Sequence, residues 1–191
     1  MQALVSRRLR LRQWQKADMA PFAELNADPE VMRYFPATLT RAQSDQFAAG
    51  ARAAIDRQGW GLWAVEVAGG AAFIGFVGLN KVRFEAHFTP AVEVGWRLAR
   101  GHWGNGYATE AAAAALAFGF GQLELDEVVS FTAAINDRSV SVMRRLGMTR
   151  DPADDFDHPN VAGGELRRHV LYRISKDQWA GAADRAGYTA R

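Results

Sequence analysis

Residues 92–111 read VEVGWRLARGHWGNGYATEA, and this stretch decides the fold that the chain can adopt. Its first part alternates apolar with polar side chains, which predicts a strand from Ala91 to Leu98. A glycine-rich loop follows. An alanine-rich run from about Gly106 to Leu123 then predicts a helix, because alanine has the highest helix propensity. Strand, loop and helix therefore form one unit.

The first sixty residues predict one strand and three helices. Leu9 and Leu11 alternate with arginines, which predicts a first strand with one solvated face. Asp18 is a candidate cap for a helix through Asn26, and Asp28-Pro29 has the cap and first-turn residues of a second helix. Thr40 precedes a long amphipathic run to Gln58, which Gly59 ends.

A hairpin and a second strand-helix unit lie on either side of the central stretch. Trp60 to Val67 and Ala72 to Phe84 predict antiparallel strands joined by a turn at Gly69-Gly70. Glu127 to Ala133 predicts a strand, followed by a helix from Asp137 to Leu146 that Gly147 ends. The remaining expected elements are a loop, Arg150 to Gly164, and a last strand, His169 to Ser175.

Length and composition predict one globular domain over residues 1–180 with a loose tail over residues 181–191. There are 23 Lys and Arg against 21 Asp and Glu, so we expect no nucleic-acid partner. The absence of cysteine excludes disulfides and thiolate chemistry. The N-terminal residues do not resemble a signal peptide, and the longest apolar run is about half the ~20 residues that span a bilayer. We therefore expect a cytoplasmic protein without a membrane partner.

The loop around Gly104 and Gly106 suits a phosphate, because small residues expose backbone amides at a helix N-terminus. It predicts an anion cradle without a basic side chain. A Walker loop is excluded because no lysine follows Gly106. A dinucleotide fingerprint fits poorly, since the nearby acids Glu124 and Asp126 precede the next strand and do not end it. A turn that binds nothing stays open, as does coenzyme A binding.

The sequence resembles the RimJ/RimL-like N-acetyltransferases of the GNAT family across most of its length. The resemblance rests on the hairpin, the strand Val92 to Leu98, the loop WGNGYATEA at 103–111, the run NDRS at 136–139 and the run RLGM at 145–148. The family's general loop pattern begins with Arg or Gln, whereas Gly101 occupies that position here. The resemblance implies an α/β (α+β) fold with a mixed, largely antiparallel twisted sheet, flanked by helices and splayed at the strand that binds acetyl-coenzyme A.

The resemblance also implies where acetyl-coenzyme A binds. Its pyrophosphate would contact the backbone amides of His102, Trp103, Gly104, Asn105, Gly106, Tyr107, Ala108 and Thr109. Its pantetheine would pair with Trp96, Arg97 and Leu98. Asn136 is a candidate for bonding to pantetheine and equally for capping the next helix. Glu110 favours the helix dipole but must point away from the pyrophosphate, so we interpret it as structural.

Acetyl transfer to an amine needs a base, a donor to the oxyanion and a proton for the departing thiolate. Glu93 is the candidate base if it faces the cleft and burial raises its pKa; the opposite face of the strand is equally allowed. Ser139 is the candidate acid, or it bonds only to backbone or ligand. A backbone amide near Gly95 or Trp96 would serve the oxyanion.

The sequence therefore predicts an N-acetyltransferase in which a primary amine attacks acetyl-coenzyme A directly. The acceptor is a protein N-terminal α-amine or a small amine, such as a polyamine, an amino acid or an aminoglycoside. A non-enzymatic coenzyme A-binding module is the other alternative. No metal is expected, since the histidines lack metal-ligand spacing and the acidic loop lacks the calcium-loop pattern. A monomer and a homodimer both remain open.

Overall fold

The computed structural model describes residues 3–186, which form one eight-stranded sheet in the order β1-β2-β3-β4-β5-β6-β8-β7. All neighbouring strands are antiparallel except β5 and β6, which are parallel. The mixed, largely antiparallel sheet and its hairpin are therefore confirmed. The strands are β1 (Leu4–Val5), β2 (Leu9–Arg12), β3 (Leu62–Val67), β4 (Gly75–Lys81), β5 (Val92–Leu98), β6 (Glu127–Ala133), β7 (Phe156–Asp157) and β8 (Arg168–Ser175).

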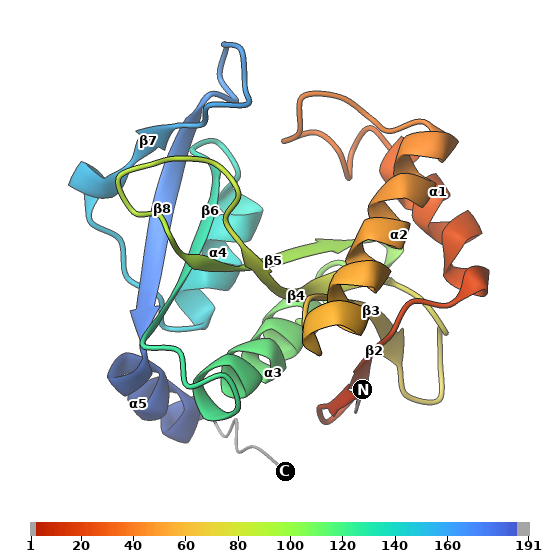
Figure 1. Ribbon diagram of the computed structural model, residues 1–191, viewed down its shortest axis with the longest axis horizontal. Coiled ribbons are helices and arrows are strands. Elements are labelled where there is room, and N and C mark those ends of the chain that lie inside the picture. Colours follow the sequence, from red (N-terminus) through yellow and green to blue (C-terminus); the bar gives the residue numbers. More distant parts are fainter. Residues whose placement is uncertain (1–2, 187–191) are drawn as a thin grey trace.

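Five α-helices flank this sheet (Figure 1). The first two lie over one half of the molecule, α3 packs on β4 and β5, and α4 lies beside β6. Within residues 3–186, no helix is both long enough and apolar enough to cross a membrane. The helices are α1 (Met19–Ala27), α2 (Arg41–Gln58), α3 (Tyr107–Gly121), α4 (Asp137–Arg145) and α5 (Lys176–Ala186).

Local signals fix the ends of α2 as the sequence predicted. Thr40 accepts a bond from the amide of Gln43, while the Gln43 side chain accepts from the Thr40 amide, which completes a capping box. Gly59 ends the helix at φ 82°, a left-handed conformation that favours glycine. These two signals need no tertiary contact, so they are readable from the chain alone.

The helix predicted to begin at Asp28-Pro29 is wrong, because residues 29–37 form turns and bends. The Met32 amide donates to the Asp28 carbonyl, but Pro36 has no amide with which to continue a helix. The Leu39 amide instead donates to the carbonyl of Asn26 at 3.0 Å, which folds the segment back on α1. The turns thereby bring residues 30–36 to the cleft described below.

Asp18 precedes α1, but its side chain does not cap that helix. It accepts bonds from Nη1 and Nη2 of Arg12 at 2.8 and 2.9 Å, and both side chains are buried. A bidentate arginine–carboxylate pair of this kind fixes the orientation of both side chains. The aspartate therefore ties β2 to the start of α1.

The helix α5 continues to Ala186, into the first residues of the tail predicted over residues 181–191. Trp179 is buried and its ring stacks on Phe120 of α3 with the ring centroids 6.2 Å apart. Tertiary packing therefore holds this helix against α3. The rest of the predicted tail, residues 187–191, lies outside the described residues.

The strand β5 pairs with its two neighbours to very different extents. It pairs with β4 along its whole length from Val92 to Leu98, but it pairs with β6 only where Glu93 faces Val129. Beyond that point the two strands diverge. The predicted splaying of the sheet at this strand is confirmed, and it leaves one edge of β5 unpaired next to the N-terminus of α3.

Candidate active site

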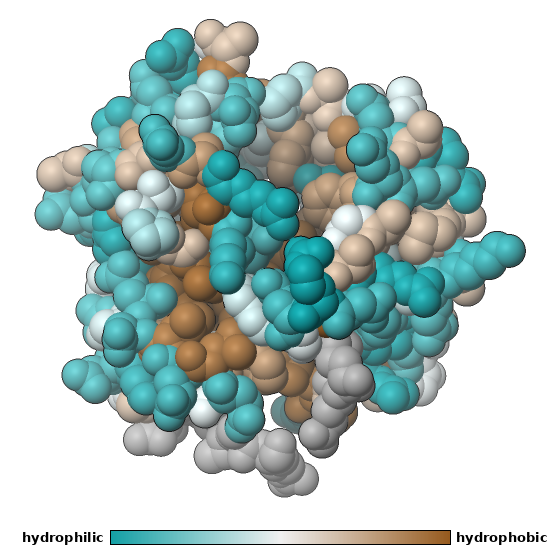
Figure 2. All heavy atoms as spheres, in the orientation of Figure 1, coloured by the Kyte–Doolittle hydropathy of each residue, from teal (hydrophilic) through white to brown (hydrophobic). Residues whose placement is uncertain are grey.

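A cleft of about 2260 Å³ occupies this opening. Ordinary small-molecule pockets measure roughly 300–1,000 Å³, so the cleft has room for a long ligand and an acceptor together. In Figure 2 the surface is hollowed between the two halves of the molecule, with hydrophobic residues at the bottom. Every site residue that the sequence predicted lines this cleft: Glu93, Trp96, Arg97, Leu98, His102, Trp103, Gly104, Asn105, Gly106, Tyr107, Ala108, Thr109, Asn136 and Ser139.

The loop before α3 presents free backbone donors to the cleft. Gly104 and Gly106 both have φ 77°, the left-handed conformation that favours glycine, and this turns the chain sharply into the helix. In the described chain, no protein group accepts a bond from the amides of residues 104–109. The positive end of the helix dipole adds to these donors, so this position suits a diphosphate.

Two amides of the predicted cradle already have partners within the chain. His102 donates its amide to the carbonyl of Ala99, and Trp103 donates to that of Arg100, so neither amide is available to a ligand. The Asn105 side chain also serves the loop, because its Nδ2 donates to the carbonyls of His102 and Trp103. A 3₁₀ turn that the sequence did not reveal causes the difference.

Glu110 has the structural role that the sequence predicted. Its carboxylate accepts bonds from the Ser6 hydroxyl at 2.8 Å and from Nε and the amide of Arg8 at 2.7 Å. Partial burial opposes ionisation, but these bonds outweigh it and lower the pKa of Glu110 below its ordinary value. The carboxylate is therefore anchored to the N-terminal segment and points away from the free amides.

The cradle does contain basic side chains, contrary to the sequence-based expectation. Arg138 and Arg145 of α4 line the cleft, and the guanidinium of Arg138 lies 4.5 Å from the centre of the Trp103 ring. The two arginines are seven residues apart, which is two helical turns, so they share one face. That spacing is readable from the sequence, although the closeness of α4 to the loop is not.

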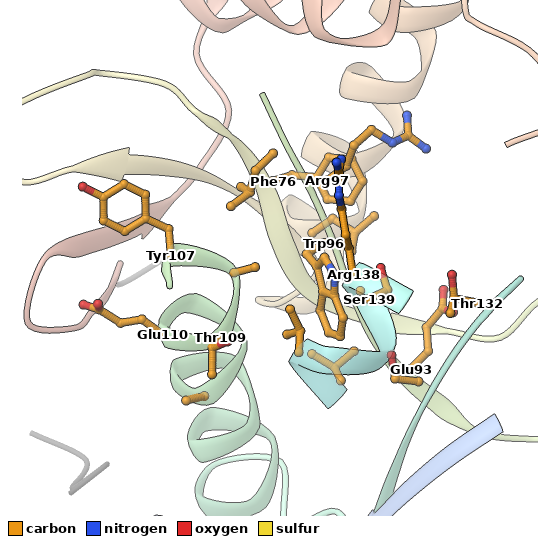
Figure 3. A pocket seen from close by; sticks show the side chains of 18 of the residues that line it. Phe76, Glu93, Trp96, Arg97, Tyr107, Thr109, Glu110, Thr132, Arg138 and Ser139 are labelled. Atoms are coloured by element: carbon orange, nitrogen blue, oxygen red, sulfur yellow. The ribbon is translucent and has the colours of Figure 1, made fainter. Parts of the chain in front are cut away.

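Glu93 lines the cleft, as its proposed role as a base requires. Burial raises the pKa of Glu93 to about 7, although a bond of 3.2 Å from Asn80 Nδ2 acts in the opposite direction. Figure 3 shows Glu93 at one end of the pocket near Thr132, with Ser139 on the adjacent α4. A carboxylate with this pKa can exchange a proton near neutral pH.

Asn136 holds the beginning of α4 and the hydroxyl of Ser139. Its Oδ1 accepts from the Ser139 amide at 3.2 Å, so the capping alternative is present in the structure. Its Nδ2 donates to Thr132 Oγ1 at 2.8 Å and to Ser139 Oγ at 3.1 Å. Because Ser139 Oγ already accepts a bond, its hydrogen is left to donate to another group in the cleft.

The three residues of β5 expected beside pantetheine make different contacts within the protein. Trp103 Nε1 donates to the carbonyl of Leu98 at 2.8 Å, which uses that acceptor. Trp96 packs its side chain against the main hydrophobic core. Arg97 turns toward α1, where its Nη1 donates to Asn26 Oδ1. Of these three contacts, only the Trp103 bond occupies a backbone group of the strand.

The sequence did not predict that two histidines at the far end of the cleft belong to it. His158 and His169 line the cleft with their ring centroids 4.8 Å apart. Burial lowers the pKa of each ring, so both stay neutral at pH 7. Only the pairing of β7 with β8 brings them together, and no sequence spacing signals it.

Residues 3–186 contain no cluster of three or more potential metal ligands.

We predict that Ser139→Ala lowers kcat about tenfold, since a thiolate with a pKa near 8.5 leaves fairly well without a proton donor. Steady-state kinetics and acetyl-coenzyme A titration should show the loss in kcat and not in affinity. Ser141→Ala, with the same change of helix propensity on α4, is the control. Equal kcat for the Ser139 variant and the parent would remove the acid role.

Comparison with known proteins identifies the family to which the chain is similar. Residues 8–149 match the family described as "Acetyltransferase (GNAT) domain". The uncharacterized protein YkkB of Bacillus subtilis (strain 168) is 32% identical over 146 residues, which cover 76% of this chain and 84% of YkkB. The FsC-acetyl coenzyme A-N(2)-transacetylase of Aspergillus fumigatus (strain ATCC MYA-4609 / CBS 101355 / FGSC A1100 / Af293) is 30% identical over 167 residues, covering 82% of this chain and 68% of that protein.

A solved structure shares the fold. Mycobacterium smegmatis RimJ in complex with CoA-disulfide superposes with a TM-score of 0.73 at 20% identity, covering 94% of this chain and 89% of that chain. At this identity the likeness shows the fold alone. The family match favours an enzyme over a binding module.

Proposed function

The chain belongs to the GNAT family of acetyltransferases, and from this premise we propose that it transfers acetyl from acetyl-coenzyme A directly to a protein N-terminal α-amine. The observation that carries the proposal is the single cleft in which free amides, an open strand edge, Glu93 and Ser139 come together. The diphosphate would bind the amides of residues 104–109, with Arg138 and Arg145 adding positive charge. Pantetheine would lie along the open edge of β5.

The proposed chemistry assigns one proton transfer to each side of the cleft. Acetyl-coenzyme A supplies an activated thioester. Glu93 accepts the proton that the attacking amine must lose, and the Ser139 hydroxyl donates one to the departing sulfur. A backbone amide near Gly95 stabilises the charge that develops on the carbonyl oxygen. The chain contains no cysteine to carry the acetyl group, which favours direct attack.

The acid–base balance of the site favours an α-amine. An α-amine has a pKa near 8, whereas a lysine side chain has a pKa near 10.4, so far more of the α-amine is neutral at pH 7. A carboxylate with a pKa of about 7 is a modest base, and it suits an amine that needs little help. The formal net charge of +2 offers no field that would attract polycationic polyamines.

We predict that a peptide with a free N-terminus and no lysine is acetylated at its α-amine. A peptide blocked at the N-terminus but carrying lysine should react much more slowly, because its amine is mostly protonated. Mass spectrometry with fragmentation locates the acetyl group, and thiol release measures the rate. Acetylation of lysine alone, or of small amines alone, would remove the N-terminal acceptor and leave the acetyltransferase assignment standing.

A further inference from the structure

Arg97 is a cation in the cleft that the proposed chemistry does not use. It lies on β5 four residues after Glu93, so both side chains leave the same face of the strand. Gly95 lies between them on that face, and a Cβ added there would meet no atom within 4 Å. The cleft is therefore open above Gly95, with an acidic group at one side and a basic group at the other.

The guanidinium of Arg97 is incompletely satisfied. Its Nη1 donates to Asn26 Oδ1 at 2.6 Å, but its Nε is shielded from solvent and has no hydrogen-bond partner. Among the side chains that the structure describes, residues 3–182, no carboxylate lies within ion-pair distance of its nitrogens. Glu93 bonds to Asn80, and Glu110 is held by Arg8. Cations shielded from water are ordinarily paired in proteins. Arg97 is half-buried and its Nε is fully shielded, so its surroundings favour an anion from outside the chain.

Aromatic rings surround this guanidinium and keep its surroundings apolar. Its central carbon lies 4.1 Å from the centre of the Phe35 ring, 5.6 Å from Phe47 and 5.4 Å from Phe76. Burial lowers the pKa of Arg97 to about 10, which leaves the group charged at neutral pH. In such surroundings, a charge-assisted bond to an anion is stronger than it is in water.

We propose that Arg97 binds a carboxylate of the acceptor, so that the enzyme prefers amines that carry a carboxylate near the reacting nitrogen. The amine would lie toward Glu93 and the carboxylate toward Arg97, across the open space above Gly95. Strand geometry separates the two Cα atoms by about 13 Å, a span that the two side chains and a small amino acid can bridge. The carboxylate can come from a free amino acid or from an acidic first residue of a peptide. The inference rests on amine acetylation in this cleft.

Matched acceptors test the preference. We would compare kcat/KM for leucine against leucinamide, and for a peptide beginning with glutamate against one beginning with glutamine. At least one carboxylate acceptor should exceed its amide by about 10- to 100-fold, as expected for a charge-assisted pair. The pair that shows the preference identifies the source of the carboxylate. Arg97→Gln should bring that ratio close to one.

The control variant is Arg52→Gln, which removes an exposed arginine from α2 and should preserve the ratio. Amides that react as well as carboxylates in the parent enzyme would overturn the inference. So would an unchanged ratio in the folded Arg97 variant.

A direct binding measurement separates this inference from the proposed function. In protein saturated with coenzyme A, the ¹⁵N-labelled Nε–H signal of Arg97 is assigned by its loss in Arg97→Lys. This signal should shift on titration with 3-phenylpropionate and stay in place with 3-phenylpropionamide. If the signal does not shift when 3-phenylpropionate is added, the inference is overturned, whether or not the protein acetylates amines. Failure of every amine to accept acetyl would contradict the proposed function, and the titration would still decide whether Arg97 binds carboxylates.

Discussion

Glu93→Gln is expected to lower kcat at pH 7 by about 100-fold, the lower end of the range for loss of a positioned acid or base. The glutamine keeps the shape of the side chain and its place beside Asn80 but cannot accept a proton. Acetyl-coenzyme A should bind with parent affinity, because the free amides of residues 104–109 do not involve this side chain. Steady-state kinetics and calorimetric titration separate the two effects.

The pH dependence of kcat/KM provides the sharper test of the same variant. In the parent enzyme, activity should rise with pH through about 7, as Glu93 loses its proton, and again near 8, as the α-amine does. The variant should lose only the first rise. Glu30→Gln, which changes an exposed carboxylate lining the same cleft, should keep both rises. A parent profile without a rise near 7, or a fully active glutamine variant, would remove Glu93 as the base.

Stability gives an independent check that Glu93→Gln folds. The pKa of Glu93 in the folded protein is raised to about 7, so the folded state binds this proton more tightly than the unfolded state does. This carboxyl group therefore makes the protein less stable as the pH rises from about 4.5 to 7. The variant lacks that loss, and its melting temperature at pH 8 should equal or exceed that of the parent.

Gly106→Val is expected to weaken acetyl-coenzyme A binding about 100-fold, which corresponds to losing roughly two charge-assisted bonds. Gly106 has φ 77°, and a β-branched residue is strained in that conformation. Relief of the strain would rotate the neighbouring amides away from the cleft, and the added side chain would crowd the same space.

The matched control for this glycine is Gly69→Val. Gly69 has φ 69°, a Cβ there would meet nothing within 4 Å, and the residue lies in the β3–β4 turn, outside the residues that line the cleft. At Gly106 a Cβ would meet only the end of the flexible Arg8 side chain, at 3.6 Å. Both variants should lose similar stability, but only Gly106→Val should lose affinity. Calorimetry on folded protein decides the matter, and equal affinities in the two variants would exclude the cradle.

Local patterns predicted most of the fold, and tertiary packing explains what they missed. The β6 strand follows from its β-branched and aromatic residues. The capped helix α2 follows from a capping threonine and a terminal glycine, which act within a few residues. The two-residue strands β1 and β7 are too short to carry a pattern. The helix α5 depends on Trp179 packing against α3, which no local signal reveals.

The candidate site also has some features that the sequence predicts and others that only the folded chain reveals. The left-handed glycines of the loop are visible in the sequence as small residues before an alanine-rich helix, and so is the placement of Ser139 after Asn136. The contact of Arg97 with Asn26 joins residues 71 positions apart, so only the folded chain reveals it. The raised pKa of Glu93 likewise depends on burial, which the period-two pattern left undecided.

A crystal structure of the protein with coenzyme A bound is the most direct test of the proposed site. The diphosphate should accept bonds from the amides of residues 104–109, and pantetheine should follow the open edge of β5. The sulfur should then lie within hydrogen-bond reach of Ser139 Oγ, on the side of the cleft that Glu93 faces. Coenzyme A bound elsewhere at saturation, with no contact to these amides, would contradict the account.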